Sequence, residues 1–366
     1  MDVGKVVGRV GVMEEVASAF KISYHKHKLE SYLRGEHIFP ATLELDITSQ
    51  CTRTCDDCPM SRGAGSHSLS MEFIENLFAS LEGQTKGLLV TGGEPTMSPD
   101  FPNILKRARE RGFSEIAIVT NGSFLDQEPV ADALLAHAST IRVSLYDWGT
   151  KSCVGVEPVL KRIEWLRKRI DAQGSDLQVG ASALTSKDRT AILPELAESV
   201  RSAGAHWIYF HPMCTGWNLG CPARVDQEGV LENVERYRRN LKNGFDAFIS
   251  RYRYVETELD FSEYHAAHFL LVIGSDGVNY LGPEVKYQPH HKLADLNSAR
   301  FNGFLRRKDR LERIRSVNSQ SYGALHSRHR GVLYNDYIEK LKQDARPVSD
   351  ETVSGTKARF RFPHIL

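Results

Sequence analysis

The chain has 366 residues, with 47 Lys and Arg against 46 Asp and Glu and a formal net charge of +1. This near-neutral balance gives none of the basic field that nucleic-acid-binding proteins use, and no apolar run is long enough to span a membrane. The apolar content of 41% is typical of globular proteins. Because the first residues lack the features of a secretory signal, we expect a cytoplasmic protein that binds neither nucleic acid nor membrane.

Strand and helix patterns alternate along the first part of the chain. Residues 13–34 predict a helical lead-in within residues 1–40, and Phe39-Pro40 ends it. The predicted strands are 43–47, 87–91, 115–120, 140–146, 177–184 and 207–211, and the predicted helices between them are 71–82, 101–112, 127–137, 156–170 and 191–203. Ser70 is the expected N-cap of the first of these helices. This alternation predicts an α/β fold with a parallel sheet and right-handed crossovers.

The pattern changes after residue 213. We expect a charged helix over 226–247, a β-hairpin near 268–281 that turns at Asp276-Gly277, and a basic helix near 300–315. The basic helix is interpreted mainly as a solvated face, with a clamp for a substrate carboxylate or phosphate as the alternative. The last twenty residues are polar and are predicted to be loosely packed. Residues 214–366 are therefore assigned to a smaller α+β extension.

Three of the six cysteines lie close together after the first predicted strand. Cys51, Cys55 and Cys58 have the spacing C-x3-C-x2-C. Three thiolates on a short loop can hold one face of a four-iron cubane and leave its fourth iron open. A zinc site would need a fourth nearby ligand, and only His67 follows at short range. A disulfide framework is disfavoured because the clustered thiols have no partners.

The second motif, Thr91-Gly92-Gly93-Glu94-Pro95, follows the second predicted strand. Together and in this order, the two motifs resemble those of the radical S-adenosylmethionine (SAM) superfamily. The resemblance implies a partial six-stranded (β/α)6 TIM-like barrel over residues 41–213 and a [4Fe–4S] cluster on the three cysteines. It also implies that the reduced cluster cleaves SAM to give a 5′-deoxyadenosyl radical, which abstracts hydrogen from the substrate. Asp57 departs from the family, which usually has an aromatic residue before the last cysteine.

The same resemblance assigns further residues to SAM. Gly92, Gly93, Glu94 and Pro95 are expected at its methionyl end, where glycines allow close backbone approach. Thr120, Asn121 and Ser144 follow or end later strands and are expected near the ribose, although Asn121-Gly122 also suits a plain turn. All of these positions lie at carboxyl ends of predicted parallel strands, where α/β barrels place their chemistry.

The extension is weakly similar to the SPASM or twitch appendages of this superfamily, which hold auxiliary clusters. Those appendages place a cysteine just after the hairpin, whereas this chain has Gly282-Pro283-Glu284 there. Cys214 and Cys221 lie near the junction, so a second iron–sulfur cluster completed by His211, Cys153 or substrate is left open. His211, Cys214 and Cys221 are also candidate catalytic residues, because a thiol could return hydrogen to a substrate radical. Packed side chains are the alternative.

These features predict a radical SAM enzyme of natural-product biosynthesis that acts on a small polar metabolite. We expect a sugar-, nucleoside- or aminoglycoside-like substrate, changed by epimerisation, dehydrogenation or decarboxylation, and a reducing partner such as flavodoxin or ferredoxin. A peptide-modifying enzyme is the alternative, disfavoured because only about 40 residues precede the first strand. A non-catalytic iron–sulfur sensor or electron carrier is disfavoured by the intact Gly-Gly-Glu-Pro motif.

Overall fold

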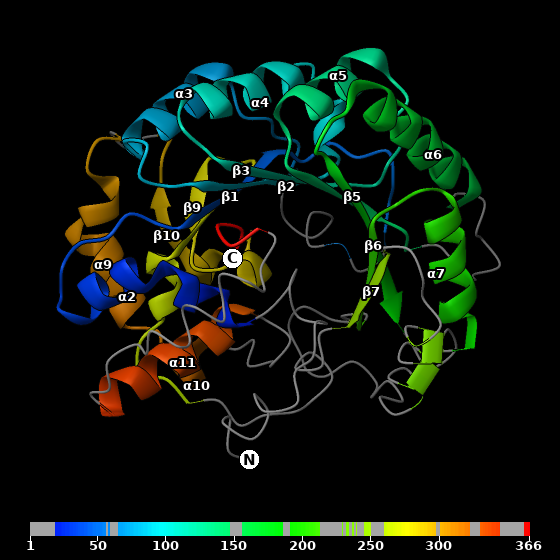
Figure 1. Cartoon of the computed structure of the whole chain (residues 1–366). Coiled ribbons are helices and arrows are strands. Elements are labelled where there is room, and N and C mark those ends of the chain that lie inside the picture. The colour runs from blue at the N-terminus through cyan, green and yellow to red at the C-terminus, as the bar shows by residue number, and fades with distance from the viewer. Residues whose placement is uncertain are drawn as a thin grey trace.

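The computed structural model describes residues 19–55, 58, 65–146, 156–185, 191–212, 245–249, 260–297, 301–322, 330–344 and 362–366, with single residues and pairs between 229 and 239. A curved sheet forms the centre of the molecule, and helices cover its convex face (Figure 1). In these parts of the chain no helix is both long and apolar enough to cross a membrane.

The described residues contain one sheet of ten strands in the order β10-β9-β8-β1-β2-β3-β4-β5-β6-β7. Its strands are β1 (Thr42–Thr48), β2 (Gly87–Gly92), β3 (Glu115–Thr120), β4 (Thr140–Ser144), β5 (Gln178–Thr185), β6 (Trp207–Pro212), β7 (Asp246–Ile249), β8 (Leu270–Ile273), β9 (Val278–Tyr280) and β10 (Lys292–Asp295). Strands β1 to β7 are parallel to their neighbours, and so are β8 and β1. The carboxyl ends of these strands therefore meet at one edge of the sheet.

The helices fall into an outer layer and a second group near the chain ends. The outer layer holds α3 (Met71–Ser80), α4 (Phe101–Glu110), α5 (Glu128–His137), α6 (Val156–Gln173) and α7 (Leu193–Ser202). The second group holds η2 (Ala19–His25), α2 (Lys26–Leu33), η7 (His265–His268), η8 (Pro283–Val285), η9 (Pro289–His291), η10 (Phe304–Arg306), α9 (Lys308–Arg315), α10 (Ser319–Tyr322) and α11 (Arg330–Asp344). As predicted, Ser70 caps α3, and its hydroxyl accepts from the Phe73 N–H at 3.2 Å.

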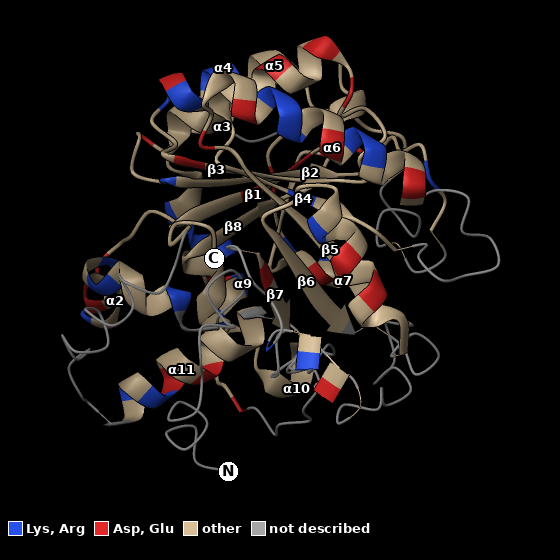
Figure 2. Cartoon of the chain, turned by 45° about the vertical axis from the view of Figure 1, so that its right-hand side comes forward, with Lys and Arg blue, Asp and Glu red and all other residues tan. Residues whose placement is uncertain are grey.

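Alternation along the strands separates two faces of the sheet. Leu43, Leu45 and Ile47 of β1 point outward into the large apolar core beneath α3–α7, while Glu44 and Asp46 point to the concave face. The outer surface of α4–α7 carries interspersed charges of both signs (Figure 2), and some of them join neighbouring helices, as Arg169 does to Asp132 at 2.7 Å. The polar concave face is therefore the part of the sheet that is available for chemistry.

The predicted α/β fold with a partial barrel is confirmed, and so is the hairpin. Strands β8 and β9 are antiparallel, and Gly277 occupies the turn with φ of 75°. The hairpin does not stand apart from the barrel, because β8 is hydrogen-bonded to β1 in the same sheet. The boundaries at residues 40 and 213 remain predictions.

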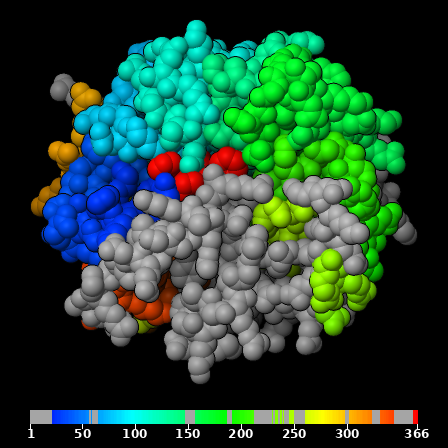
Figure 3. Space-filling view, in the orientation of Figure 1, coloured from blue at the N-terminus to red at the C-terminus, as the bar shows by residue number. Residues whose placement is uncertain are grey.

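Three predictions about the later chain are corrected in whole or in part. Residues 246–247 were expected to be helical, but Asp246–Ile249 is the strand β7 beside β6. The basic stretch, described from residue 301, contains a 3-10 turn and the helix α9, and the predicted solvated face is confirmed for its other described basic residues, which are exposed; only Arg310 departs from it, because it is buried at 2% exposure. The last twenty residues were expected to be loosely packed; residues 347–361 lie outside the described residues, but Ile365 and Leu366 are buried at 9% and 1% exposure. Residues 362–366, red in Figure 3, lie between the N-terminal lead-in (blue) and the layer of outer helices (cyan and green).

Candidate functional site

The Gly-Gly-Glu loop lies directly against the chain that leads into the cysteines. The N–H of Gly93 donates to the carbonyl of Thr48 at 2.8 Å. A Cβ on Gly92 would lie 2.3 Å from the Thr48 carbonyl oxygen, and one on Gly93 would lie 2.2 Å from that of Gln50. Both glycines are therefore required by contact with the protein's own backbone just before Cys51, whatever further contact they make with SAM.

Glu94 is completely buried, and its carboxylate is surrounded by donors from two loops. One oxygen accepts from the Thr96 N–H at 3.1 Å, the Thr96 hydroxyl at 2.5 Å and the Thr120 hydroxyl at 2.7 Å. The other accepts from the Asn121 N–H at 2.6 Å. The predicted SAM residues after β2 and after β3 are thus brought together, and Glu94 is the group that joins them.

Asn121 continues this connection to the cysteine loop. Its side-chain amide donates to the Cys51 sulfur at 3.6 Å and to the Thr52 hydroxyl at 3.0 Å. Its carbonyl accepts from the Arg53 guanidinium at 3.3 Å, and the Ser123 hydroxyl lies 3.0 Å from that of Thr52. The loops after β1, β2 and β3 therefore form one hydrogen-bonded unit.

The three cysteines of the motif lie on the first loop of this unit. Cys51 is exposed, and Cys55 and Cys58 are half-buried. The Cys58 N–H donates to the Cys55 carbonyl at 3.2 Å, so the backbone groups of these two cysteines are in direct contact. Among the described residues no three His, Cys, Asp or Glu side chains converge on one ion. The cysteines that hold a cubane each bind a different iron and need not converge on one ion, so three cysteine donors suit a cluster. Asp57 lies outside the described residues.

Ser144 and His211 lie on the inner wall formed by β4–β6. Ser144 is 8% exposed and pairs in register with Ser182 of β5. The His211 ring stacks on Tyr209, with centroids 5.1 Å apart, and meets the edge of Tyr146 at 6.0 Å. One predicted SAM residue and one predicted catalytic residue thus lie on the same wall, on strands separated by β5. The candidates Cys153, Cys214 and Cys221 lie outside the described residues.

Sequence reasoning missed a charged group inside the barrel. Lys286 lies 2.8 Å from a carboxylate oxygen of Asp46 and 3.0 Å from one of Glu44, and the Tyr287 hydroxyl donates to Asp46 at 2.6 Å. Burial raises the pKa of Asp46, although the Lys286 ammonium opposes this. Asp46 pairs in register with Thr91, one step before the Gly-Gly-Glu loop. The sequence signal that could have revealed this group was the presence of two acidic residues, Glu44 and Asp46, in a buried strand.

The place after the hairpin, where SPASM and twitch appendages carry a cysteine, contains a buried carboxylate. Glu284 accepts hydrogen bonds from the Tyr264 hydroxyl at 3.1 Å and the Tyr322 hydroxyl at 2.6 Å. The two tyrosine rings stack with centroids 4.7 Å apart. Tyrosine hydroxyls that donate to a carboxylate fill this position with oxygen groups rather than with a thiolate.

A partial parallel barrel with a cysteine loop and a glycine-rich loop at one edge of the sheet defines a class of cluster-binding enzymes. Residues 45–182 match the family model described as Radical SAM superfamily. Residues 45–182 therefore form a radical SAM enzyme domain, whose cofactors are a [4Fe–4S] cluster and SAM.

Curated relatives include two proteins named probable GTP 3′,8-cyclase. The one from Sulfurisphaera tokodaii is 23% identical over 222 residues, which cover 58% of this chain and 67% of the relative. The one from Sulfolobus acidocaldarius is 28% identical over 182 residues, which cover 48% of this chain and 57% of the relative. The matched part of the chain covers 67% of the length of the first relative and 57% of the second.

Among solved structures, SuiB from Streptococcus suis shares the fold. It superposes with a TM-score of 0.62 over 88% of this chain and 79% of its own, at 16% identity. A further SuiB structure holds the precursor peptide SuiA. At this level of identity the likeness concerns the fold alone.

Proposed function

We propose that this radical SAM enzyme abstracts hydrogen from a small polar metabolite of the nucleoside class. Cys51, Cys55 and Cys58 would hold the [4Fe–4S] cluster, which together with SAM supplies a 5′-deoxyadenosyl radical when both are bound. The relatives named GTP 3′,8-cyclase support a nucleoside-like substrate over the sugar and aminoglycoside alternatives.

The observation that carries this proposal is the hydrogen-bonded unit centred on Glu94. Its carboxylate fixes the loops after β2 and β3, and Asn121 fixes the second loop to Cys51. Backbone groups of Gly92 and Gly93 are thereby held beside the cysteine loop, where they are placed to orient the methionyl end of SAM. Preorganisation of this kind positions the reactants and limits competing reactions.

We assign the inner wall formed by β4–β6 to the remaining parts of SAM and of the substrate. Ser144 would bind a ribose, and the half-buried His211 ring, which is stacked on the buried Tyr209, would offer its other face to a planar base. A peptide-modifying enzyme is the second candidate, since SuiB shares the fold. A low-potential flavodoxin or ferredoxin would supply the electron.

The cluster assignment is tested by anaerobic reconstitution of the wild type and of a variant with Cys51, Cys55 and Cys58 all changed to Ala. About four irons per chain in the wild type and none in the variant are expected for one cubane on these three cysteines. Dithionite-dependent release of 5′-deoxyadenosine should follow the iron. A variant that keeps about four irons would show a second cluster and would overturn the assignment of a single cluster.

The substrate class is tested by offering GTP, guanosine and short unstructured peptides to the reconstituted enzyme. A nucleoside substrate should accelerate SAM cleavage, and deuterium at its reacting carbon should appear in 5′-deoxyadenosine. Acceleration by peptides alone would replace the proposed function with peptide modification.

A further inference from the structure

The side chain of Asn121, just after β3, is held in one orientation by contacts with the protein itself. Its Oδ1 accepts from the Ser123 N–H at 2.9 Å, the contact that closes the turn over Gly122. Its Nδ2 donates to the Thr52 hydroxyl at 3.0 Å and to the Cys51 sulfur at 3.6 Å. Because a backbone N–H can only donate, the amide oxygen must face Ser123 and the amide nitrogen must face the cysteine loop.

A plain turn does not account for this arrangement. The turn needs only the side-chain oxygen, which an aspartate would supply as well. The side-chain nitrogen adds two contacts with the cysteine loop. The backbone of Asn121 is also held from two sides, by the Glu94 carboxylate at 2.6 Å and by the Arg53 guanidinium at 3.3 Å. With 8% of its surface exposed, Asn121 presents a fixed donor to Cys51.

Two N–H donors converge on the Cys51 sulfur. The backbone N–H of Arg53 lies 3.4 Å from it within the cysteine loop, and the Asn121 amide reaches it from the loop after β3. Hydrogen bonds to the sulfurs are among the factors that set the reduction potential of an iron–sulfur cluster. Reduction adds negative charge, so these donors favour the reduced state more than the oxidised one and raise the potential.

We propose that Asn121 is a positioning residue for the cluster: its amide orients the Cys51 thiolate and raises the reduction potential of the [4Fe–4S] cluster. This inference rests on the proposed function, in which Cys51 is a cluster ligand. The step concerned is the one-electron reduction of the cluster from its 2+ to its 1+ state, with the electron supplied by flavodoxin, ferredoxin or dithionite. This role differs from the contact with the SAM ribose that the family resemblance implies.

The test uses Asn121→Asp, which keeps the oxygen for the Ser123 N–H and replaces the N–H donors with a second oxygen. Asn318→Asp is the matched control, because the Asn318 Oδ1 likewise accepts from the Ser321 N–H at 2.9 Å, at an exposed position before α10. A hydrogen bond to a charged group changes an equilibrium constant about tenfold, which is about 59 mV for one electron, so redox titration at pH 8 should show at least this fall in Asn121→Asp alone.

Asn121→Ala separates the lost donor from the added charge. It should lower the potential as well, but by less than Asn121→Asp does. Iron per chain after reconstitution and the melting temperature of the cluster-free protein are measured for every variant. A variant that melts like the wild type but loads less iron would support the role of Asn121 in orienting Cys51, because the fold is then intact.

A wild-type potential in the Asn121→Asp and Asn121→Ala chains that carry the cluster would overturn the inference. A loss of iron no greater than the loss of folded protein would also overturn it, because Asn121 would then serve the turn alone. The variant with all three cysteines changed to Ala tests the cluster assignment separately. If it keeps its iron, the proposed ligands are wrong; if it loses its iron while the Asn121 variants keep the wild-type potential, only the role of Asn121 is refuted.

Discussion

At the scale of single residues, Glu94 shows how a residue of a cofactor motif can act within the protein. The family resemblance places it at the methionyl end of SAM, yet its carboxylate is fully engaged by Thr96, Thr120 and Asn121. Four hydrogen bonds surround this buried carboxylate, and they are effective only while every donor is aligned. We therefore expect Glu94 to fix the geometry of the loops directly and to affect ligand binding only through that geometry.

Glu94→Gln tests this role. In the variant, the NH2 of the Gln side chain replaces one of the two carboxylate oxygens. The donors that face this oxygen in the wild type would then face another donor, so at least one buried group loses its partner. We expect a loss of about 1–3 kcal/mol in the free energy of unfolding and a lower iron content after reconstitution. Urea unfolding and iron analysis measure the two effects. Glu195→Gln, on an exposed face of α7, is the control. Normal stability and iron in Glu94→Gln would contradict the role.

Gly93→Ala tests the contact between the two loops. The added methyl group would meet backbone oxygens of residues 49 and 50 at 2.5 and 2.2 Å, and backbone cannot move aside as a side chain can. We expect reduced cluster loading because the chain before Cys51 is displaced. Gly174→Ala meets nothing within 4 Å and is the control for a Gly-to-Ala change without a clash; its φ of 62° adds backbone strain that Gly93 does not have, so it is a stringent control. Equal iron content in the two variants would show that the close approach is dispensable.

At the scale of elements, the short segment 362–366 closes the end of the barrel opposite the cysteines. The Thr42 hydroxyl donates to the His364 carbonyl at 2.5 Å, and Lys21 donates to the Ile365 carbonyl at 2.9 Å. Gly87 has no room for a side chain, because a Cβ would lie 1.8 Å from the His364 carbonyl oxygen. The first residues of β1 and β2 are thereby matched to this segment.

Glu115, at the start of β3, makes this contact depend on pH. Its carboxylate accepts from the His364 N–H at 2.7 Å, and burial raises its pKa to about 7. Below pH 4.5 the group is protonated in both states. Between pH 4.5 and 7 only the unfolded chain releases the proton, so stability should fall as pH rises, by at most about 3 kcal/mol.

Glu115→Gln should remove this pH dependence, because Gln keeps an acceptor for the His364 N–H without a carboxyl proton. The difference in unfolding free energy between variant and wild type, measured in urea at pH 5 and pH 8, should favour the variant more at pH 8. Taking the difference cancels the histidines common to both proteins. A difference that is equal at the two pH values would refute the raised pKa.

The same elements show what the sequence could and could not predict. Alternating patterns predicted β1 to β6 and α3 to α7 because each element satisfies its own periodicity. The motif residues could be brought together because parallel strands end at one edge. The partners of Glu94 and the Ser144–Ser182 pair depend on register between strands. Segment 362–366 and β7 are too short to show a period, and long-range contacts alone fix them.

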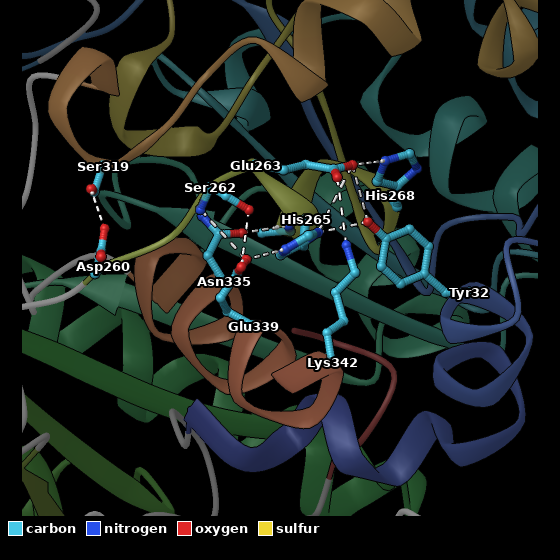
Figure 4. Close-up of polar contacts among 11 residues, drawn as sticks. Tyr32, Asp260, Ser262, Glu263, His265, His268, Ser319, Asn335, Glu339 and Lys342 are labelled. Carbon is cyan, nitrogen blue, oxygen red and sulfur yellow. Dashed lines mark hydrogen bonds and ion pairs between the residues drawn. The ribbon is translucent and has the colours of Figure 1, made fainter. Parts of the chain in front are cut away.

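At the scale of the whole molecule, a polar network joins three segments that are far apart in the sequence (Figure 4). His265 of η7 is fully buried; its Nδ1 lies 2.7 Å from the Tyr32 hydroxyl of α2, and its Nε2 lies 2.8 Å from a carboxylate oxygen of Glu339 in α11. The Asn335 side chain also accepts from the Ala266 N–H at 2.7 Å. Because η7 leads into β8, this network connects the lead-in and the last described helix to the central sheet.

The network should therefore behave as one unit in stability measurements. His265→Ala leaves both Tyr32 and Glu339 without their shared partner, and we expect a loss of about 3 kcal/mol in urea unfolding of the full chain. Tyr32→Phe and Glu339→Gln should each cost less, and together they should differ from the sum by more than about 0.5 kcal/mol, because both residues bind one imidazole.

Glu164→Gln provides the matched control for this cycle. Glu164 pairs with Lys168 at 2.7 Å on an exposed face of α6, where solvent screening leaves an ion pair little effect on stability. Additive effects of Tyr32→Phe and Glu339→Gln, or a His265→Ala loss as small as that of Glu164→Gln, would show that the three segments are held independently. A coupled result would mean that α2 and α11 unfold together with the part of the sheet that contains β8 and β9. In that case β1, which carries the cysteine loop, is stabilised on one side by β2 and on the other by β8 and this network.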